Sequence, residues 1–143
     1  MHVLPYLNFE GRCEEALDFY REAVGARVNG MLRYSDHPGG PAACEGAVPP
    51  AGDKIMHASF MVGETLLLAT DGMAQGDPRF EGMALTLAVR SDDEARRRFD
   101  ALAAGGVVRS PLEPTFFASQ FGVVTDRFGV TWMVVHLSPP AGL

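Results

Sequence analysis

The imidazole of His57 is the first candidate for chemistry in this sequence, because it is a titratable group in the middle of a predicted strand. Residues 54–62 alternate so that Ile55, His57, Ser59 and Met61 share one face of that strand. A histidine there can donate or accept a hydrogen bond near neutral pH. Two interpretations stay open: His57 and Ser59 contact a ligand, or His57 is a structural residue that is hydrogen-bonded within the sheet.

An aromatic cluster beside a predicted loop could supply the apolar part of a ligand site. It consists of Phe116, Phe117, Gln120 and Phe121. Aromatic rings give a ligand site contact area, and an amide side chain can orient the bound molecule. The alternative is ordinary packing of these residues in the core and at its rim.

Two further predicted strands carry candidates for the same site. On residues 83–89 one face is small, with Ala84, Thr86 and Ala88, and leaves room for a ligand unless a bulky neighbour fills it. We expect the larger opposite face, with Leu85 and Leu87, to pack under a helix. On the last strand Met133 and Trp132 point in opposite directions, so we assign Trp132 to the core between sheet and helix and Met133 to the ligand side.

The elements that must position these side chains follow from periodicity and turn residues. In the first half of the chain, an apolar strand at 3–9 precedes a helix whose core-facing residues repeat at intervals of three and four. That helix ends at Gly25, and its apolar stripe is Cys13, Ala16, Leu17, Tyr20 and Val24. Strands are predicted at 27–34, 54–62 and 65–70, the last two joined by a two-residue turn. Residues 35–52 form a long loop, a length typical of lids and binding loops.

The second half repeats this order. A strand at 83–90 leads to Ser91 and Glu94, whose spacing is that of a capping box, and to a helix that buries Ala95, Phe99, Leu102 and Ala103. A short strand at 107–108, a proline-bearing loop at 110–115 and a hairpin of strands 120–125 and 131–137 complete it. The sequences of the two predicted helices align at an offset of 80 residues, which pairs Glu14 with Glu94 and Gly25 with Gly105.

The overall composition excludes several classes of partner. The 143 residues carry a formal net charge of −6, so nucleic acid and anionic membrane surfaces would repel the chain. No apolar run approaches the roughly 20 residues of a spanning helix, and residues 1–5 do not resemble a signal peptide. We therefore expect a cytoplasmic protein in which Cys13 and Cys44 are reduced thiols.

Five segments of the chain resemble the PhnB-like branch of the vicinal oxygen chelate superfamily, often labelled 3-demethylubiquinone methyltransferase-like. In this sequence they read PYLNF at 5–9, EALDFY at 15–20, KIMHA at 54–58, FDALAAGG at 99–106 and DRFGVTW at 126–132. The resemblance, which extends to the glyoxalase, bleomycin resistance and dioxygenase proteins, implies an α+β fold. Two βαβββ modules, at about 1–71 and 82–137, would form curled mixed sheets around a cavity in one domain, 1–143. It also implies a homodimer.

The resemblance implies metal ligands on the first and fourth strand of each module, and these strands lack them. The nearest residues to the ligand positions are Pro5 on the first strand and Met133 on the last, and residues 65–70 and 83–89 offer no His, Asp, Glu or Cys. A divalent cation needs several such ligands, so we expect no metal and no other cofactor. A rebuilt metal site could use only residues at strand ends or on other strands, namely His57, His136, Asp71 and Glu64.

Two hypotheses of function follow. The first is a metal-free glyoxalase-fold protein that binds a small, partly apolar molecule through His57, Ser59, Thr86, Phe116, Phe117, Gln120 and Met133. The second is an enzyme of the glyoxalase or dioxygenase type that uses His57 or an atypical metal site. We assign no residue a catalytic role. A methyltransferase, as the family label suggests, is rejected because the chain has no glycine-rich turn between a strand and a helix and no room for a doubly wound nucleotide domain.

Overall fold

The computed structural model describes residues 1–37 and 50–138. It divides into two compact units, Met1–Arg79 and Phe80–Leu143. Most of the predicted loop at 35–52 lies outside the described residues, so its expected role as a lid stays a prediction. In its described residues each unit contains one α-helix and one four-stranded sheet, and each unit is described by itself.

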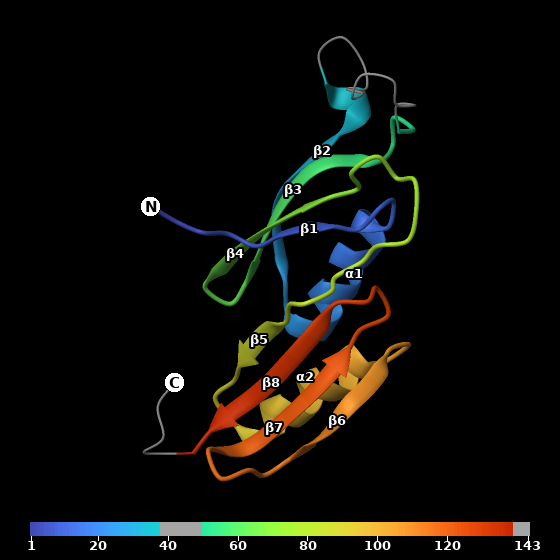
Figure 1. Cartoon of the computed structure of the whole chain (residues 1–143). Helices are drawn as coiled ribbons and strands as arrows, with labels where there is room; N and C mark the ends of the chain where they lie inside the picture. The colour runs from blue at the N-terminus through green and yellow to red at the C-terminus, as the bar shows by residue number, and fades with distance from the viewer. Residues whose placement is uncertain (38–49, 139–143) are drawn as a thin grey trace. The chain divides into compact units, whose positions relative to one another are not determined.

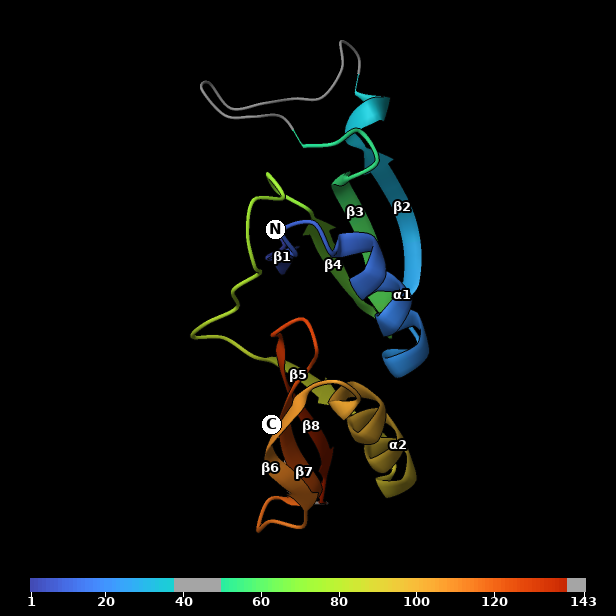
Figure 2. The same ribbon diagram turned by 90° about the vertical axis from the view of Figure 1, so that its right-hand side faces the viewer.

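The first unit is a βαβββ module. It contains β1 (Tyr6–Asn8), α1 (Cys13–Val24), β2 (Arg27–Arg33), a 3-10 turn (Tyr34–Asp36), β3 (Ile55–Val62) and β4 (Thr65–Thr70). The strands lie in the order β1-β4-β3-β2, with β1 parallel to β4 and the other pairs antiparallel. Figure 2 shows α1 along one face of this sheet.

The second unit has the same topology. It contains β5 (Leu85–Ala88), α2 (Asp92–Ala103), β6 (Val107–Glu113), β7 (Ala118–Thr125) and β8 (Thr131–Leu137). The order β5-β8-β7-β6 repeats that of the first sheet, again with one parallel pair, β5 and β8 (Figure 1). The predicted repeat of one βαβββ unit is therefore confirmed, and so are the predicted α+β class and the mixed sheets.

The helix α1 forms because its apolar residues fall on one stripe that the sheet buries. All five predicted core positions of the helix are buried, and Tyr20 stacks on Phe60 of β3 with ring centroids 6.3 Å apart. Gly25 ends the helix with φ of 68°, a left-handed conformation that glycine adopts without a steric penalty. The stripe and its end were both predicted correctly.

The helix α2 begins as expected at Ser91, but its cap differs in one contact. The Ser91 hydroxyl accepts a hydrogen bond from the Glu94 backbone N–H at 3.1 Å. The Glu94 carboxylate reaches back to the N–H of Arg90 rather than to that of Ser91, so the capping box is only half formed. Ala95, Phe99 and Leu102 are buried, whereas Ala103 is only half-buried, which corrects the predicted stripe at its last position.

The strand β6 is longer than predicted. Residues 110–113 continue the strand through Pro111, where the sequence favours a loop. Proline lacks a backbone donor, but β6 is the outer strand of its sheet, and its register with β7 shifts twice along this stretch. An edge strand with such irregularities tolerates proline, and for this reason the predicted loop is wrong here.

Gly106 directly precedes β6, and we expect even a substitution by alanine there to lower stability strongly. A Cβ atom at this position would lie 2.2 Å from the backbone oxygen of Thr125 and 3.0 Å from Cα of Asp126. Backbone atoms cannot move aside as a flexible side chain can, so Gly106→Ala is expected to lower the free energy of unfolding by about 2–3 kcal/mol. Urea denaturation checks this. Gly76→Ala is the control, because a Cβ at Gly76 meets nothing within 4 Å; equal effects of the two changes would contradict the prediction.

Candidate functional site

The face of the first sheet that turns away from α1 carries the predicted candidates of that unit. Ala58 and Phe60 of β3 are fully buried, whereas His57 and Ser59 are half-buried on the opposite face. Ser59 lies in register with Leu68 of β4, and Leu68 with Tyr6 of β1, so these side chains form one row across the sheet. We call this face, represented by Tyr6, His57, Ser59 and Leu68, the open face of the first sheet.

Tyr6 is the partner of His57 on this face. The Tyr6 hydroxyl lies 3.4 Å from Nδ1 of His57, and the ring centroids are 5.8 Å apart. Sequence reasoning missed Tyr6, although the alternation of residues 6–9 contained the signal: Leu7 and Phe9 are buried, so Tyr6 must point the other way. The pair offers a ligand one phenol hydroxyl and one imidazole, next to apolar Leu68.

The second sheet brings Thr86 and Met133 together on the face that turns away from α2. Thr86 of β5 lies in register with Met133 of β8, and Met133 with Val123 of β7. Thr86 is exposed and Met133 is half-buried, while Trp132 is 2% exposed and belongs to the core under α2, as predicted. We call the face with Thr86, Phe121, Val123 and Met133 the open face of the second sheet.

The predicted aromatic cluster is real, but it does not include Gln120. Phe117 contacts Phe121 edge-on at 5.3 Å between centroids, and Phe116 contacts Phe117 at 5.1 Å. Phe116 is 98% exposed. Gln120 precedes Phe121 on β7 and is in register with His136, so its side chain lies on the helix side of the sheet. The expected arrangement, with the amide beside the rings, is therefore not formed.

The open faces of the four strands that would hold a metal carry few suitable ligands. Within residues 1–37 and 50–138, no group of three His, Cys, Asp or Glu side chains is placed to hold a cation. By alternation, the open-face residues of these strands are Tyr6 and Asn8 on β1, Leu66, Leu68 and Thr70 on β4, Thr86 and Ala88 on β5, and Thr131, Met133, Val135 and Leu137 on β8. Tyrosine, amide and thioether groups are weak ligands for zinc and similar ions.

Asp71, one of the residues left for a rebuilt metal site, already has a structural role. Its Oδ1 accepts hydrogen bonds from the backbone N–H groups of Gly11 and Cys13 at the start of α1, at 3.0 and 2.7 Å. Its Oδ2 accepts one from the N–H of Ile55 at 2.6 Å. The side chain is 1% exposed, so this carboxylate ties the helix start to β3 and is shielded from ligands.

The Cys13 thiol lies in the same buried environment. Burial and the nearby Asp71 carboxylate raise the pKa of Cys13 to about 12. A thiol with such a pKa stays protonated at neutral pH, and the protonated form is a poor nucleophile. Cys13 is therefore a core residue, as its helical spacing predicts.

A polar cluster that the sequence does not reveal joins the start of α2 to β7 and β8. Nδ1 of His136 lies 2.7 Å from Oδ1 of Asp92 and 2.8 Å from the hydroxyl of Ser119, and the same hydroxyl also contacts Asp92. These contacts hold the pKa of the Asp92 carboxyl below its usual range, the His136 bond contributing most. Serine and aspartate share one imidazole nitrogen, so the cluster lacks the relay geometry of a nucleophilic triad, in which they occupy different nitrogens.

The sequence holds only part of the signal for this cluster. Alternation predicts that His136 points away from Met133, and the contact with α2 agrees. Ser119, however, sits at an irregularity where two residues of β7 advance against one of β8, between Ala118 and Gln120. Such a bulge redirects a side chain without any simple sequence pattern.

Comparisons with known proteins agree with this architecture. The model of the family described as 3-demethylubiquinone-9 3-methyltransferase matches residues 1–135. The chain is 31% identical over 138 residues to Protein YjdN of Escherichia coli (strain K12), which covers 94% of each chain. It also matches the crystal structure of protein PA1353 from Pseudomonas aeruginosa, with 42% sequence identity and a TM-score of 0.81. The match covers 96% of this chain and 98% of that one.

The glyoxalase-like fold is confirmed by a more distant structure. The glyoxylase/bleomycin resistance protein/dioxygenase domain from Frankia sp. EAN1pec matches 96% of this chain and 95% of its own, with a TM-score of 0.62 at 17% identity. Identity that low concerns the fold alone. Among the described residues, no helix is long and apolar enough to cross a membrane.

Proposed function

This chain belongs to the 3-demethylubiquinone-9 3-methyltransferase family, and on that premise we propose that it binds a small, partly apolar molecule without a metal ion. The observation that carries the proposal is the chemistry of the two open faces. Where metal-dependent proteins of this fold would present His or Glu, these strands present Tyr6, Leu68, Thr86 and Met133. Such side chains suit a ligand that offers apolar surface and a few hydrogen bonds.

Each open face, taken by itself, offers groups that suit such a ligand. The first sheet presents polar groups, His57 with Tyr6 and Ser59, which can orient a carbonyl or hydroxyl group of a ligand. The second unit presents apolar area through Met133, Phe117 and Phe121, and the Thr86 hydroxyl lies beside Met133. We expect Gln120 and Phe116 to contribute less to ligand binding, because Gln120 faces the helix side of the sheet and Phe116 is almost fully exposed.

We do not extend the family's name to methyl transfer by this chain. Nucleotide-type cofactors bind at glycine-rich turns in doubly wound parallel sheets. Each sheet here is mixed and has four strands, and the turn between β5 and α2, Val89-Arg90-Ser91, contains no glycine.

An enzyme that uses His57 or an atypical metal is the second candidate, and one experiment separates it from the first. We expect protein purified without added metal to contain well under one equivalent of zinc, nickel or manganese. We also expect that adding these ions confers no glyoxalase activity on the hemithioacetal of methylglyoxal and glutathione. Elemental analysis and the standard absorbance assay measure both quantities.

The control for this experiment compares two histidine variants. His57 is half-buried beside Tyr6, whereas His2 is exposed near the amino end of the chain. Near-stoichiometric metal that is lost in His57→Ala and kept in His2→Ala would overturn the metal-free proposal and support the enzyme. Metal lost in neither variant would still refute the metal-free part and leave His57 without a metal-binding role.

We further propose that the protein is a cytoplasmic homodimer. The outer strands β2 and β6 each have one unpaired edge, and apolar side chains near them are exposed: Leu32 at 50%, Val107 at 52% and Val108 at 47%. Exposed apolar edges are commonly covered in natural proteins. Light scattering at micromolar concentration should give twice the chain mass of 15.4 kDa; a mass of one chain would refute the dimer.

A further inference from the structure

A pocket at the end of β1 is lined by charged side chains that the proposed function does not use. Its volume is about 420 Å³, and its lining consists of Asn8, Glu10, Gln75, Gly76, Asp77 and Arg79. That volume lies within the range of small-molecule sites. We propose that this pocket binds a small zwitterion, a molecule of the amino-acid type that carries one carboxylate and one ammonium group.

The pocket has the position that parallel strands give to ligand sites. β1 and β4 are parallel neighbours, so their carboxyl ends lie at the same end of the sheet, where Asn8 pairs with Thr70. The segment after β1 and the segment after β4 form the walls. Loops that a rigid sheet holds in place commonly carry binding sites.

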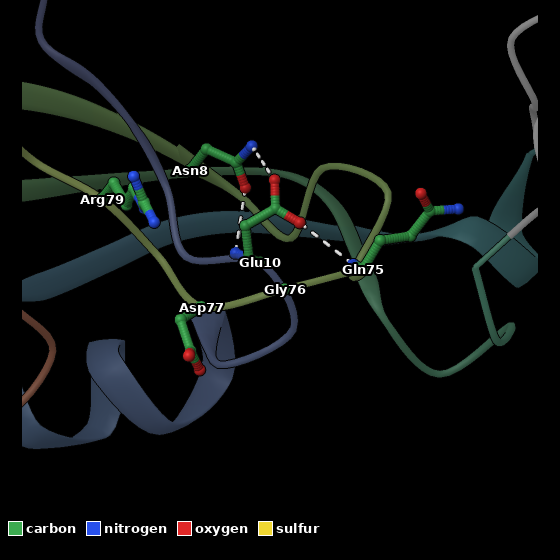
Figure 3. Close-up of a pocket in the computed structure, with 6 residues that line it drawn as sticks. All are labelled: Asn8, Glu10, Gln75, Gly76, Asp77 and Arg79. Carbon is green, nitrogen blue, oxygen red and sulfur yellow. Dashed lines mark hydrogen bonds between the residues drawn. The ribbon is translucent and has the colours of Figure 1, made fainter.

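Hydrogen bonds fix the Glu10 carboxylate in this pocket. Its Oε1 accepts from the Asn8 amide at 2.7 Å, and its Oε2 accepts from the backbone N–H of Gln75 at 3.1 Å. The Asn8 carbonyl in turn accepts from the Glu10 N–H at 2.9 Å. Figure 3 shows this closed arrangement of Asn8, Glu10 and Gln75, which joins the two walls. Each carboxylate oxygen still has a free lone pair with which to accept from a ligand.

The backbone around this arrangement adopts costly conformations. Glu10 and Ala74 are the non-glycine residues with positive φ in the described part of the chain, at 49° and 53°, and Gln75 directly follows Ala74. At Gly72 a Cβ atom would lie 2.5 Å from the Asn8 amide, so only glycine leaves room for that side chain. Strain of this kind concentrates at binding and catalytic sites, and here it serves to place Glu10.

The cation of the pocket is Arg79. Figure 3 shows Arg79 and Asp77 on the segment after β4, and the Asp77 carboxylate points away from Asn8 and Glu10. Within residues 1–37 and 50–138, Arg79 forms no hydrogen bond or ion pair. A guanidinium presents a planar pair of donors that matches a carboxylate, so Arg79 is available to bind one.

The charges select a zwitterion over a simple anion. The lining holds one guanidinium, that of Arg79, and two carboxylates, those of Glu10 and Asp77, which gives it a net negative charge. An anion alone would gain from Arg79 and be repelled by both acids, whereas an ammonium group on the same molecule is attracted by Glu10. A carboxylate on Arg79 and an ammonium on Glu10 therefore satisfy both charges at once.

The free amino acids are the probes for this site. We expect a thermal-shift screen of the twenty standard amino acids at about 10 mM, followed by calorimetry, to find at least one that binds with millimolar or better affinity. Its N-acetyl and α-amide derivatives, which each lack one charge, should bind at least about tenfold more weakly. Arg79→Gln and Glu10→Gln should each weaken binding of the parent amino acid by about the same factor.

Arg97→Gln is the matched control, because Arg97 is an exposed arginine of α2 outside the pocket. This variant should bind the parent amino acid as tightly as the original chain does. If Glu10→Gln fails to fold, Arg79→Gln and the two derivatives still decide the matter. No binding by any of the twenty amino acids, equal binding of the derivatives, or acetate binding that needs Arg79 and ignores Glu10 would each overturn the proposal. The residues that the proposed function uses, among them Tyr6, His57 and Met133, are not among these six, so either proposal can fail alone.

Discussion

Replacing Phe99 with alanine is expected to lower the free energy of unfolding by about 3–5 kcal/mol, the usual cost of emptying a large aromatic site in a core. Phe99 is 3% exposed on α2. Its ring lies on Gly122 of β7, where an added Cβ would come within 2.7 Å of Cε2. The backbone of β7 cannot collapse into the space that the ring vacates, so the cavity is expected to persist. Urea or guanidinium denaturation gives the measurement.

Phe116→Ala is the matched control for this change. It removes the same ring from a position that is 98% exposed, so the free energy of unfolding should change by no more than about 0.5 kcal/mol. A loss below about 1 kcal/mol in Phe99→Ala would show that the ring contributes little to the core.

Replacing Asp71 with alanine should be equally damaging, for a polar reason. The change leaves three backbone N–H groups, those of Gly11, Cys13 and Ile55, without their acceptor. Each buried donor without a partner costs about 1–3 kcal/mol, so we expect a total loss of about 3–5 kcal/mol after partial relaxation. Asp71→Asn keeps one oxygen and should lose about 1–3 kcal/mol. Denaturation of both variants measures this graded series.

Asp77→Ala is the matched control for Asp71→Ala, because it removes a carboxylate that holds no backbone N–H group among the described residues. Asp77 lies in the same connecting segment and forms no hydrogen bond or ion pair within the part of the chain that the structure describes. Its replacement should leave stability within about 0.5 kcal/mol of the original chain. If Asp71→Ala were as mild as Asp77→Ala, water would have to replace the carboxylate at the start of α1, and Asp71 would not tie that helix to β3.

Periodicity in the sequence predicted most of the fold. The stripe from Cys13 to Val24 predicted a helix and its buried face, and alternation on the last strand separated Trp132 from Met133. These predictions succeeded because each depends on a local repeat that the core must satisfy. Pro111 misled the prediction because its effect depends on whether its strand is central or at the edge, which only the sheet order decides.

The candidate site was less accessible to sequence reasoning. The shared face of His57 and Ser59 follows from alternation, and Tyr6 could have been found in the same way. Gln120 was grouped with Phe121 on the basis of composition, although adjacent residues of a strand face opposite sides. The contact of Gln75 with Glu10 joins residues far apart in the chain, and no local pattern contains it.

The position of β1 beside β4 has a consequence for the order in which each unit can be completed. Tyr6 pairs with Leu68, and Leu85 pairs with Trp132, so the first strand of each unit finds its partner only in the last. During synthesis on the ribosome, the opening strand must wait until nearly the whole unit has emerged. Without the last strand of a unit, its first strand has no partner to pair with. We therefore expect each module to fold as one cooperative unit rather than in two steps.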